Sequence, residues 1–503
     1  MESFVVAISG LLANLTLQSG LVLVLAFLTT YWLLGAGSRQ KNLPPGPRGL
    51  PLLGNLLSFR PSHLLSNLAA WRQQYGDVFC VRIVNKLVVV LNGHKAIRDA
   101  LVKQPEVFSD RPSVSKGHYK DEGIAMARYG DDWKVKRRLG LTALRQFGMG
   151  KRSLEGKITE EARSLCAVLA EKNGTATEIS LLLSNGVSNV ICVMSFGERF
   201  EYNDMEFQRL MRLISGISGN AGSSIATSIP FLRKLPFFRK ELEKVKRNNK
   251  ELVDFVKAKI KEHKETFDPA DIRDIIDVYL METQYQTPDD ADRTITEIGM
   301  VSTIRGLFMA GADTTSTTLR WGLLYLARHL EVQRKLQEEI DREFGASPPT
   351  YSQRGKLPYT EATILEIQRI RPIAPLSLPH TTSAATVLRG FDIPANTLVI
   401  PNLWSTMMDP EMTPDPETFN PDRFLDEDGR LVRPEWFIPF SMGRRQCLGE
   451  QLAKMELFIF LATLLQHFTF KLPDGAPAPS MDGSLGVVLA PKAYQTCAVP
   501  RDD

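Results

Sequence analysis

The stretch FSMGRRQCLGEQLAKMELF, residues 440–458, sets a lone cysteine directly before an amphipathic helix. Apolar residues recur at helical spacing from Leu448 to Leu465, which predicts that Cys447 lies near the helix N-terminus. Free backbone amides and the positive end of the helix dipole would favour a thiolate there over a thiol. A lone cysteine is nevertheless more often a buried packing residue than a ligand.

The residues around this cysteine add further requirements. Gly443 and Gly449 allow tight turns and a close approach of the backbone to a flat ligand. Arg445 could hold an anionic group on such a ligand. Because the spaced pattern F-x-x-G-x-R-x-C-x-G rarely arises by chance, it indicates a ligand-binding loop rather than simple packing.

Length and charge limit the class of protein. At 503 residues the chain is too long for one simple hydrophobic core, and residues 50–500 contain no repeat or low-complexity tract. A large compact body, with two lobes as a further possibility, is therefore expected. The 61 basic and 57 acidic residues give a net charge of +4, which is too balanced to suggest a nucleic-acid partner.

The five cysteines are far apart, odd in number and never in a CxxC pair. Neither a disulfide framework nor a zinc site is expected from this pattern. The body of the protein is expected in a reducing compartment.

The N-terminus has the features of a membrane anchor. No charged residue occurs between Glu2 and Arg39, and the apolar stretch is long enough for a span at about residues 15–36. A cleaved signal peptide is the alternative, but the segment lacks a basic start. Basic residues after the span place the body on the cytoplasmic side, so the chain divides into an anchor, 1–38, a proline-rich connector, 39–54, and a catalytic domain, 55–503.

The remaining pattern predicts a mainly α fold with small β-sheets. Residues 78–84 and 86–92 read as a β-hairpin, and helical patterns dominate from about 95 to 345. Among them, 241–265 is apolar on one face and densely charged on the other. Short strands return around 384–402 and near the C-terminus.

The cysteine loop resembles the haem-binding loop of the cytochromes P450, and the residues after it resemble the animal microsomal, family-2-like branch. The residues that match are Phe440, Gly443, Arg445, Cys447 and Gly449. The resemblance implies a P450 fold, haem b as the cofactor, and Cys447 as the axial ligand of the haem iron.

Two further motifs match that family in the expected order. Glu366 and Arg369, with Arg423 in FNPDRF, resemble its structural Glu-Arg-Arg network, which supports the cysteine loop. Residues 297–328 read as an apolar helix interrupted by Gly311, Asp313 and Thr314, although a polar patch satisfied by core partners is the alternative. By resemblance this helix borders the oxygen site, with Thr314 and Asp313 as catalytic residues that guide protons.

The resemblance also implies a set of contacts to the haem propionates. Trp133 and Arg137, one helical turn apart, belong to this set, together with Arg111, His380 and Arg445. On amphipathic helices the Trp133–Arg137 spacing is common, and a histidine beside a proline is usually structural.

The implied function is a monooxygenase that inserts one atom of O2 into a lipophilic steroid, fatty acid or xenobiotic. NADPH–cytochrome P450 reductase, with cytochrome b5 as a second candidate, would supply electrons, since no dinucleotide-binding fingerprint is present. The implied location is the endoplasmic reticulum membrane, with a single span. Apolar substrate contacts are expected from residues 111–128, 309–315, 374–380 and 485–488. A haem-thiolate isomerase or lyase acting on a peroxide, and a non-enzymatic haem-binding protein, are the alternatives.

Overall fold

The computed structural model describes residues 42–84, 86–112, 123–147, 152–218, 236–284 and 296–501, with a few positions between 19 and 30. Most of the predicted anchor at 15–36 lies outside the described residues. Within the described parts of the chain, no helix is both long and apolar enough to cross a bilayer.

Helices form most of the described chain. In chain order they are η1 Leu56–Phe59, α3 Leu64–Tyr75, α4 Gly93–Leu101, α5 Pro105–Phe108, α6 Gly123–Met126, α7 Asp131–Gln146, α8 Arg152–Ala170, α9 Ser180–Phe196, α10 Met205–Ser218, α12 Pro236–Thr266, α13 Ile275–Gln284, α14 Glu297–Arg328, α15 Leu330–Phe344, η4 Tyr351–Lys356, α16 Pro358–Ile370, α17 Trp404–Met407, η5 Pro421–Phe424, η6 Gly443–Arg445 and α18 Glu450–His467.

The strands are short and form small sheets. They are β1 Val78–Ile83, β2 Lys86–Asn92, β3 His380–Thr381, β4 Thr386–Leu388, β5 Phe391–Ile393, β6 Leu398–Asn402, β7 Phe468–Lys471, β8 Gly483–Leu485, β9 Leu489–Pro491 and β10 Cys497–Pro500. The largest sheet has the order β1-β2-β6-β3, with β2 and β6 parallel and the other pairs antiparallel. The predicted mainly α fold with small sheets is confirmed, as is the hairpin.

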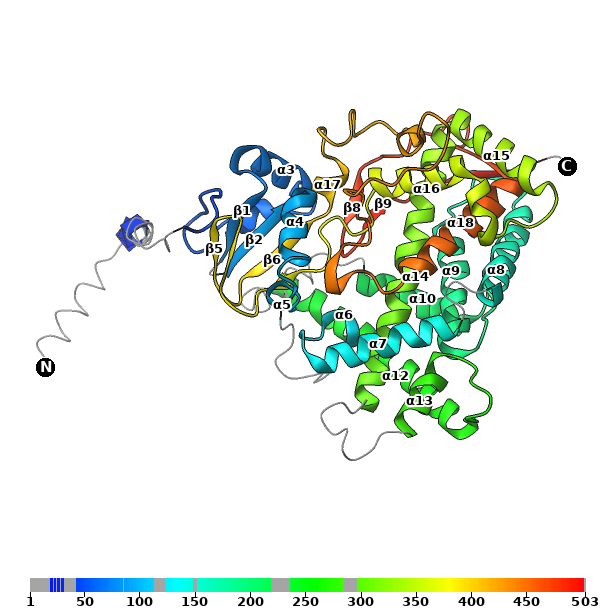
Figure 1. The fold of residues 1–503 in the computed structure, drawn as a ribbon, viewed down its shortest axis with the longest axis horizontal. Helices are drawn as coiled ribbons and strands as arrows, with labels where there is room; N and C mark the ends of the chain where they lie inside the picture. Colours follow the sequence, from blue (N-terminus) through cyan, green and yellow to red (C-terminus); the bar gives the residue numbers. More distant parts are fainter. Residues whose placement is uncertain are drawn as a thin grey trace, which may run out of the picture.

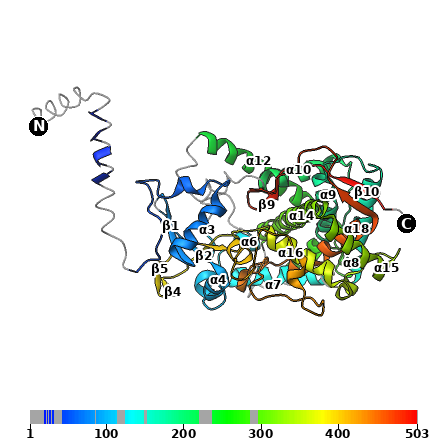
Figure 2. The same ribbon diagram turned by 90° about the horizontal axis from the view of Figure 1, so that it is seen from above.

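The long helix α14 runs through the helical body, and the largest sheet lies at the end of the molecule nearer the N-terminus (Figure 1). Helix α14 begins where Thr296 Oγ1 accepts a hydrogen bond from the Gly299 amide at 3.0 Å. It packs along α9 and also contacts α16 and α18, which lie beside it in the view from above (Figure 2). Its observed bounds agree with the predicted helix 297–328.

The two faces of the β1-β2-β6-β3 sheet belong to different clusters of buried residues. Val88 and Val90 face η1 and α3, whereas Val89 and Leu91 face α4 and the segment around Phe424. This division follows from the alternation of side chains along a strand. The second cluster joins the sheet to Met442, in the cysteine loop.

The described part of the proline-rich connector is docked onto strand β1. The Cys80 amide donates to the Pro45 carbonyl at 2.7 Å, and the Cys80 thiol lies 3.0 Å from the Pro44 carbonyl. A Cβ on Gly46 would lie 1.8 Å from the Cys80 carbonyl oxygen, so only glycine fits there. Residues 44–46 are thus part of the folded body.

Candidate functional site

The loop before α18 is closed by its own backbone. The Cys447 amide donates to the Phe440 carbonyl at 3.0 Å, and Gly443 has φ +75°. A Cβ on Gly443 would lie 2.3 Å from the Leu101 carbonyl oxygen, so both conformation and space require glycine. A Cβ on Gly449 would meet no protein atom within 4 Å. Protein packing therefore explains Gly443, whereas Gly449 leaves open space beside the cysteine.

The helix entrance favours a thiolate as predicted, but its effect is smaller than that of burial. Burial raises the pKa of the Cys447 thiol, outweighing the lowering by the Gly449 amide and by the charge of Arg137. Cys447 as a residue is nevertheless exposed to solvent. In the chain by itself Cys447 is a free thiol that needs an added positive charge to ionise.

The predicted propionate contacts are brought together beside this loop. Arg445 donates through Nε to the Ser109 carbonyl at 2.8 Å. Its guanidinium carbon lies 4.2 Å from the centre of the Trp133 ring. The Trp133 indole donates to the Ile124 carbonyl at 2.9 Å. Arg137 lies over the same indole ring, 5.6 Å from its centre, and donates to a carbonyl of the cysteine loop.

These cations are poorly neutralised by the protein. Burial and the neighbouring Arg445 lower the pKa of Arg111 to about 9, and burial lowers the pKa of Arg445 to about 10. Arg111 donates to the Leu378 and Pro379 carbonyls, at 2.8 and 2.9 Å, rather than to a carboxylate. The cluster of buried cations accordingly favours binding of an anionic group.

His380 completes this cluster with an unused nitrogen. Its Nδ1 lies 2.6 Å from the Phe108 carbonyl and donates to it, while the buried Nε2 has no partner among the described residues. Burial and the charge of Arg111 hold the pKa of His380 well below its usual value. An anion beside Nε2 would reverse this effect by stabilising the protonated ring.

An accessible thiol, open space over Gly449 and a cluster of buried cations fit the predicted haem. The thiolate would ligate the iron, the flat ring would lie close to the backbone at Gly449, and the cations would hold the propionates. The donor types and the charge balance agree with that group.

Glu366, Arg369 and Arg423 also lie together. Arg369 makes a bidentate pair with Glu366, at 2.6 and 2.8 Å, and both side chains are fully buried. Arg423 Nε lies 3.6 Å from Glu366 Oε1. Next to Arg423, the Phe424 ring packs on the Phe437 ring, with 5.1 Å between the ring centres. Both rings belong to the buried cluster that also contacts Met442 of the cysteine loop. This chain of contacts links the three charged residues to the loop.

Gly311, which interrupts the apolar run of α14, faces a neighbouring helix rather than open space. A Cβ there would lie 2.6 Å from Ile191 Cδ1, so Gly311 allows α14 to pack closely on α9. Ala312 is buried. Ala310, in the same turn, is exposed, and its carbonyl accepts a hydrogen bond from the Thr314 hydroxyl at 2.7 Å.

Asp313 and Thr314 point to different sides of α14. Asp313 lines a cavity of about 150 Å³ together with Thr317 and Arg320, which follow it by four and seven residues and share its helix face. Successive helical residues are rotated by about 100°, so Thr314 faces away from that cavity. A proton path that uses both residues would have to pass around the helix.

Glu456 is a buried carboxyl that the motif analysis missed. It lies on α18 and accepts a hydrogen bond from the Thr315 hydroxyl at 3.0 Å, and its Oε1 has no partner among the described residues. Burial raises the pKa of Glu456 to about 8, with Thr315 opposing the shift. The carboxyl is therefore largely protonated at neutral pH and joins α14, beside Thr314, to the helix that follows Cys447.

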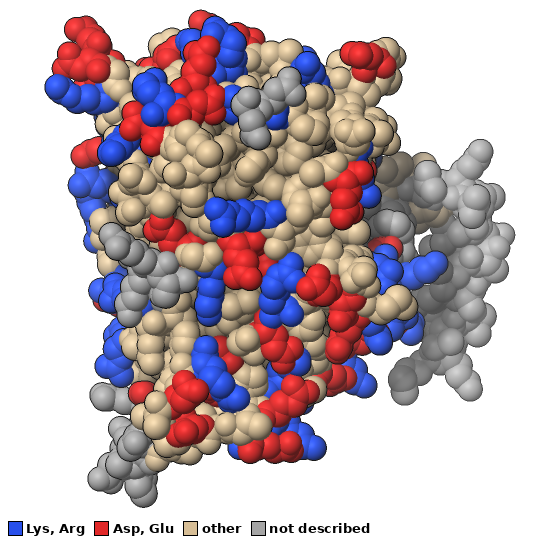
Figure 3. Space-filling model, turned by 90° about the vertical axis from the view of Figure 1, so that its right-hand side faces the viewer, with Lys and Arg blue, Asp and Glu red and all other residues tan. Residues whose placement is uncertain are grey.

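The basic residues around α7 do not form a uniform cationic surface. Lys136 is buried, and its ammonium nitrogen lies 2.8 Å from a carboxylate oxygen of Asp132. Lys134 pairs with Asp131 at 2.8 Å, whereas Arg138 is exposed. The face of the molecule in Figure 3, on the side of α8 and α15, also carries basic and acidic side chains interspersed. A protein partner would have to recognise local groups rather than a broad field.

The five cysteines are all free, as the spacing predicted. Cys166 and Cys192 are buried, and burial raises the pKa of both thiols, that of Cys166 to about 12. Cys447 is the exposed member of the set. Exposure and surroundings thus separate it from the packing cysteines.

Comparison with known proteins gives a consistent result. The family model described as Cytochrome P450 matches residues 44–498. The chain is 40% identical to human Cytochrome P450 2U1 over 489 residues, covering 91% of this chain and 89% of that protein. It is 40% identical to human Cytochrome P450 2J2, covering 92% of each, and 40% identical to Cytochrome P450 2B4 of Oryctolagus cuniculus, covering 95% and 99%.

Proposed function

Because the chain belongs to the cytochrome P450 family and is a haem b monooxygenase, we propose that Cys447 is the axial ligand of its iron. The haem, when bound, supplies the activation of O2 and the insertion of one oxygen atom into a substrate. The observation that carries the assignment is an accessible thiol beside buried, unneutralised cations.

The residues around Cys447 hold the cofactor in this proposal. Arg111, Arg445 and the protonated His380 bind the propionates, and Trp133 and Arg137 complete that contact. When a propionate binds, each arginine gives up one backbone carbonyl acceptor, and a charge-assisted hydrogen bond to the propionate carboxylate offsets this loss. The Glu366–Arg369–Arg423 network keeps the loop in place through Phe424.

Thr314 and Asp313 manage protons in this proposal. The Thr314 hydroxyl donates to the Ala310 carbonyl, so its lone pairs can accept a hydrogen bond from a water molecule while the hydroxyl proton keeps its position. Asp313 supplies protons from a side of the helix about 100° away from Thr314, through the cavity that it lines with Arg320. The two groups act in sequence, connected by water, rather than in contact.

The substrate is lipophilic and electrons come from an NADPH-dependent reductase in this proposal. Microsomal relatives support the reductase and an endoplasmic reticulum membrane location, with residues 1–38 as the anchor. The folded domain then begins near Pro44, inside the connector, because residues 44–46 pack on β1. Exposed Arg138, with Lys134 and Arg444, is the local site that an acidic reductase surface would meet.

Labelled dioxygen tests this function. Purified protein, reductase, NADPH and a panel of lipophilic compounds should give a product that carries one atom of the label. Product without label, formed from a peroxide without NADPH, would instead establish an isomerase.

A further inference from the structure

Helix α14 carries an unbroken run of hydroxyl side chains, TTSTT at 314–318. Three of them, at positions 314, 316 and 318, donate to the carbonyl four residues earlier in the same helix, at 2.7, 2.7 and 2.9 Å. A hydroxyl bound in this way shares the carbonyl with the backbone amide of the next turn, which weakens or bends the helix. The turn that holds Thr314 is therefore a weakened part of α14.

Thr315 differs from these three residues because its hydroxyl bonds to another helix. It is buried and donates to Glu456 Oε2 on α18 at 3.0 Å. Among the described residues, the other side-chain bond between this run and a neighbouring helix is donated by Ser184 of α9 to Ser316 at 3.5 Å, the limit for a hydrogen bond. The Thr315–Glu456 bond is therefore the stronger of the two bonds that hold this turn from outside.

Glu456 can hold the turn because its carboxyl is buried and largely neutral. Its Oε1 has no partner among the described residues, and burial keeps the proton on the group near neutral pH. A neutral carboxyl still accepts the Thr315 hydroxyl through its carbonyl oxygen. Since α18 begins at Glu450, directly after the Cys447 loop, the bond ties the helix of that loop to the turn of Thr314.

We propose that Glu456 is a positioning residue for the reaction, which fixes the α14 turn through Thr315 so that the Thr314 hydroxyl keeps its orientation toward the oxygen site. This inference rests on the proposed proton role of Thr314 and deepens it. Glu456 acts through Thr315 and transfers no proton itself. Loss of the bond leaves haem and substrate in place but lets the turn move, so proton delivery fails more often and reduced oxygen leaves as hydrogen peroxide.

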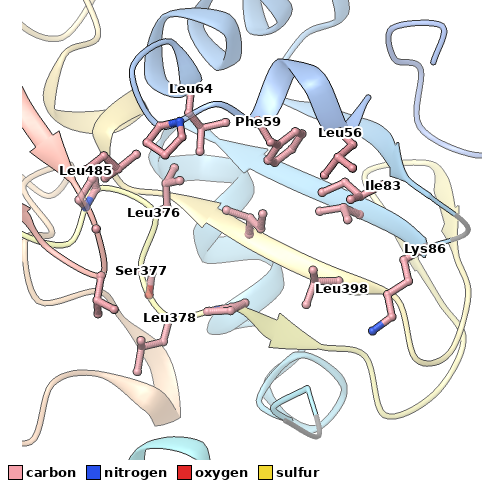
Figure 4. A pocket seen from close by; sticks show the side chains of 17 residues that line it. Leu56, Phe59, Leu64, Ile83, Lys86, Leu376, Ser377, Leu378, Leu398 and Leu485 are labelled. Carbon is pink, nitrogen blue, oxygen red and sulfur yellow. The ribbon is translucent and has the colours of Figure 1, made fainter. Parts of the chain in front are cut away.

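Poor placement of the substrate would also release peroxide, and the structure allows this cause to be separated. The apolar pocket of about 240 Å³ on the largest sheet is lined by residues such as Leu376 and Leu485, from segments where substrate contacts are expected (Figure 4). Thr315 and Glu456 are not among its lining residues, and Thr315 is buried and bonded to α18. Changes at these two residues should therefore leave the dissociation constant of the substrate unchanged.

Variants of similar volume test the bond in the holoprotein. Glu456→Met and Thr315→Val each remove one partner, and each should raise hydrogen peroxide per NADPH by about fivefold, the effect of one lost hydrogen bond. The double variant should be no worse than either single variant, because both remove the same bond. Glu456→Gln keeps a neutral acceptor and should restore the product yield. Thr463→Val, at a buried α18 threonine whose hydroxyl has no partner among the described residues, is the matched control and should have no effect.

Two further readouts need no turnover. In Glu456→Met the amides of residues 312–319 should exchange hydrogen about fivefold faster than in the wild type, while those of α16 should keep their rates. In the carbon-monoxide complex the infrared C–O band should broaden, because this stretch responds to nearby dipoles and the Thr314 hydroxyl would take several orientations. Both changes should be absent in Glu456→Gln. Added to Thr314→Ala, Glu456→Met should release no further peroxide.

Several results would overturn the positioning role. These are an unchanged peroxide yield in Glu456→Met, equal defects in Glu456→Met and Glu456→Gln, faster exchange throughout the domain, or substrate binding that weakens as much as peroxide rises. If Thr314→Ala itself leaves the product-to-NADPH ratio unchanged, the proton role of Thr314 fails instead. The local exchange rates and the C–O band still report whether Glu456 holds the turn, so the two failures are told apart.

Discussion

Replacing Glu456 by Gln should remove a steep pH dependence from the stability of the protein. Burial raises the folded-state pKa of Glu456 from 4.5 to about 8. The native state then holds a proton that the unfolded chain has released, so this stabilisation is complete below about pH 4.5 and is lost as the pH rises through about 8. At 1.36 kcal/mol per pKa unit, the loss between pH 5.5 and pH 7.5 is roughly 2.5 kcal/mol.

The free energy of unfolding by urea, followed by circular dichroism under conditions where refolding recovers the signal, measures this loss. Haem loading and ionic strength must be the same at both pH values, because a bound cofactor adds its own stabilisation. Glu456→Gln should lose about 2.5 kcal/mol less than the wild type between pH 5.5 and pH 7.5. The exposed Glu427→Gln variant should behave like the wild type. An equally steep loss in Glu456→Gln would refute the buried, protonated carboxyl.

Three other substitutions test separate parts of the structure. Gly443→Ala should lower the free energy of unfolding in urea by at least about 3 kcal/mol, because the new Cβ clashes with backbone and the residue must adopt a left-handed conformation. The variant should also retain less haem. Gly475→Ala, with φ +72° but open space, should cost only about 1 kcal/mol, and equal losses would remove the clash from the explanation. Burial lowers the pKa of His263, but the hydrogen bond to Asp274 at 2.6 Å outweighs it and the pKa is raised. The stability that this pair contributes should therefore be present below about pH 6.5 and fade above it. His263→Gln should abolish that trend, and a variant whose thermal unfolding from pH 5.5 to 8 matches the wild type would contradict it. Thr314→Ala should retain haem and NADPH use while product falls and hydrogen peroxide rises about tenfold or more, and an unchanged product-to-NADPH ratio would exclude the proton role.

The helices and strands that depend on the local residue pattern could be predicted from the sequence. Helix α14 was predicted with its bounds because a long, largely apolar run is a property of the segment itself. The hairpin β1-β2 followed from alternation of residues about a short turn. The residues of the cysteine loop and of the charged network came from resemblance, and the structure brings them together.

The features that could not be predicted depend on contacts that the sequence alone does not specify. The packing role of Gly311 could not be predicted, because its neighbour is Ile191 of α9, a contact between segments far apart in the chain. The burial of Lys136 could not be predicted from its charge, and its ammonium group pairs with the exposed Asp132 of the same helix. One missed signal was available: Glu456 is the sole ionisable residue between Lys454 and His467, in a run that is otherwise largely apolar. A carboxyl in such a run is either buried and protonated or paired.

The absorption spectrum of the reduced carbon-monoxide complex tests the role of Cys447 most directly. The wild type should show the red-shifted Soret band of thiolate ligation, while Cys447→His should retain some haem and lose both that band and the oxygenase activity. Cys166→Ser, a change at a buried packing cysteine, is the control and should keep the band. An unshifted Soret band in the wild type, or an unchanged red-shifted band in Cys447→His, would contradict Cys447 as the iron ligand.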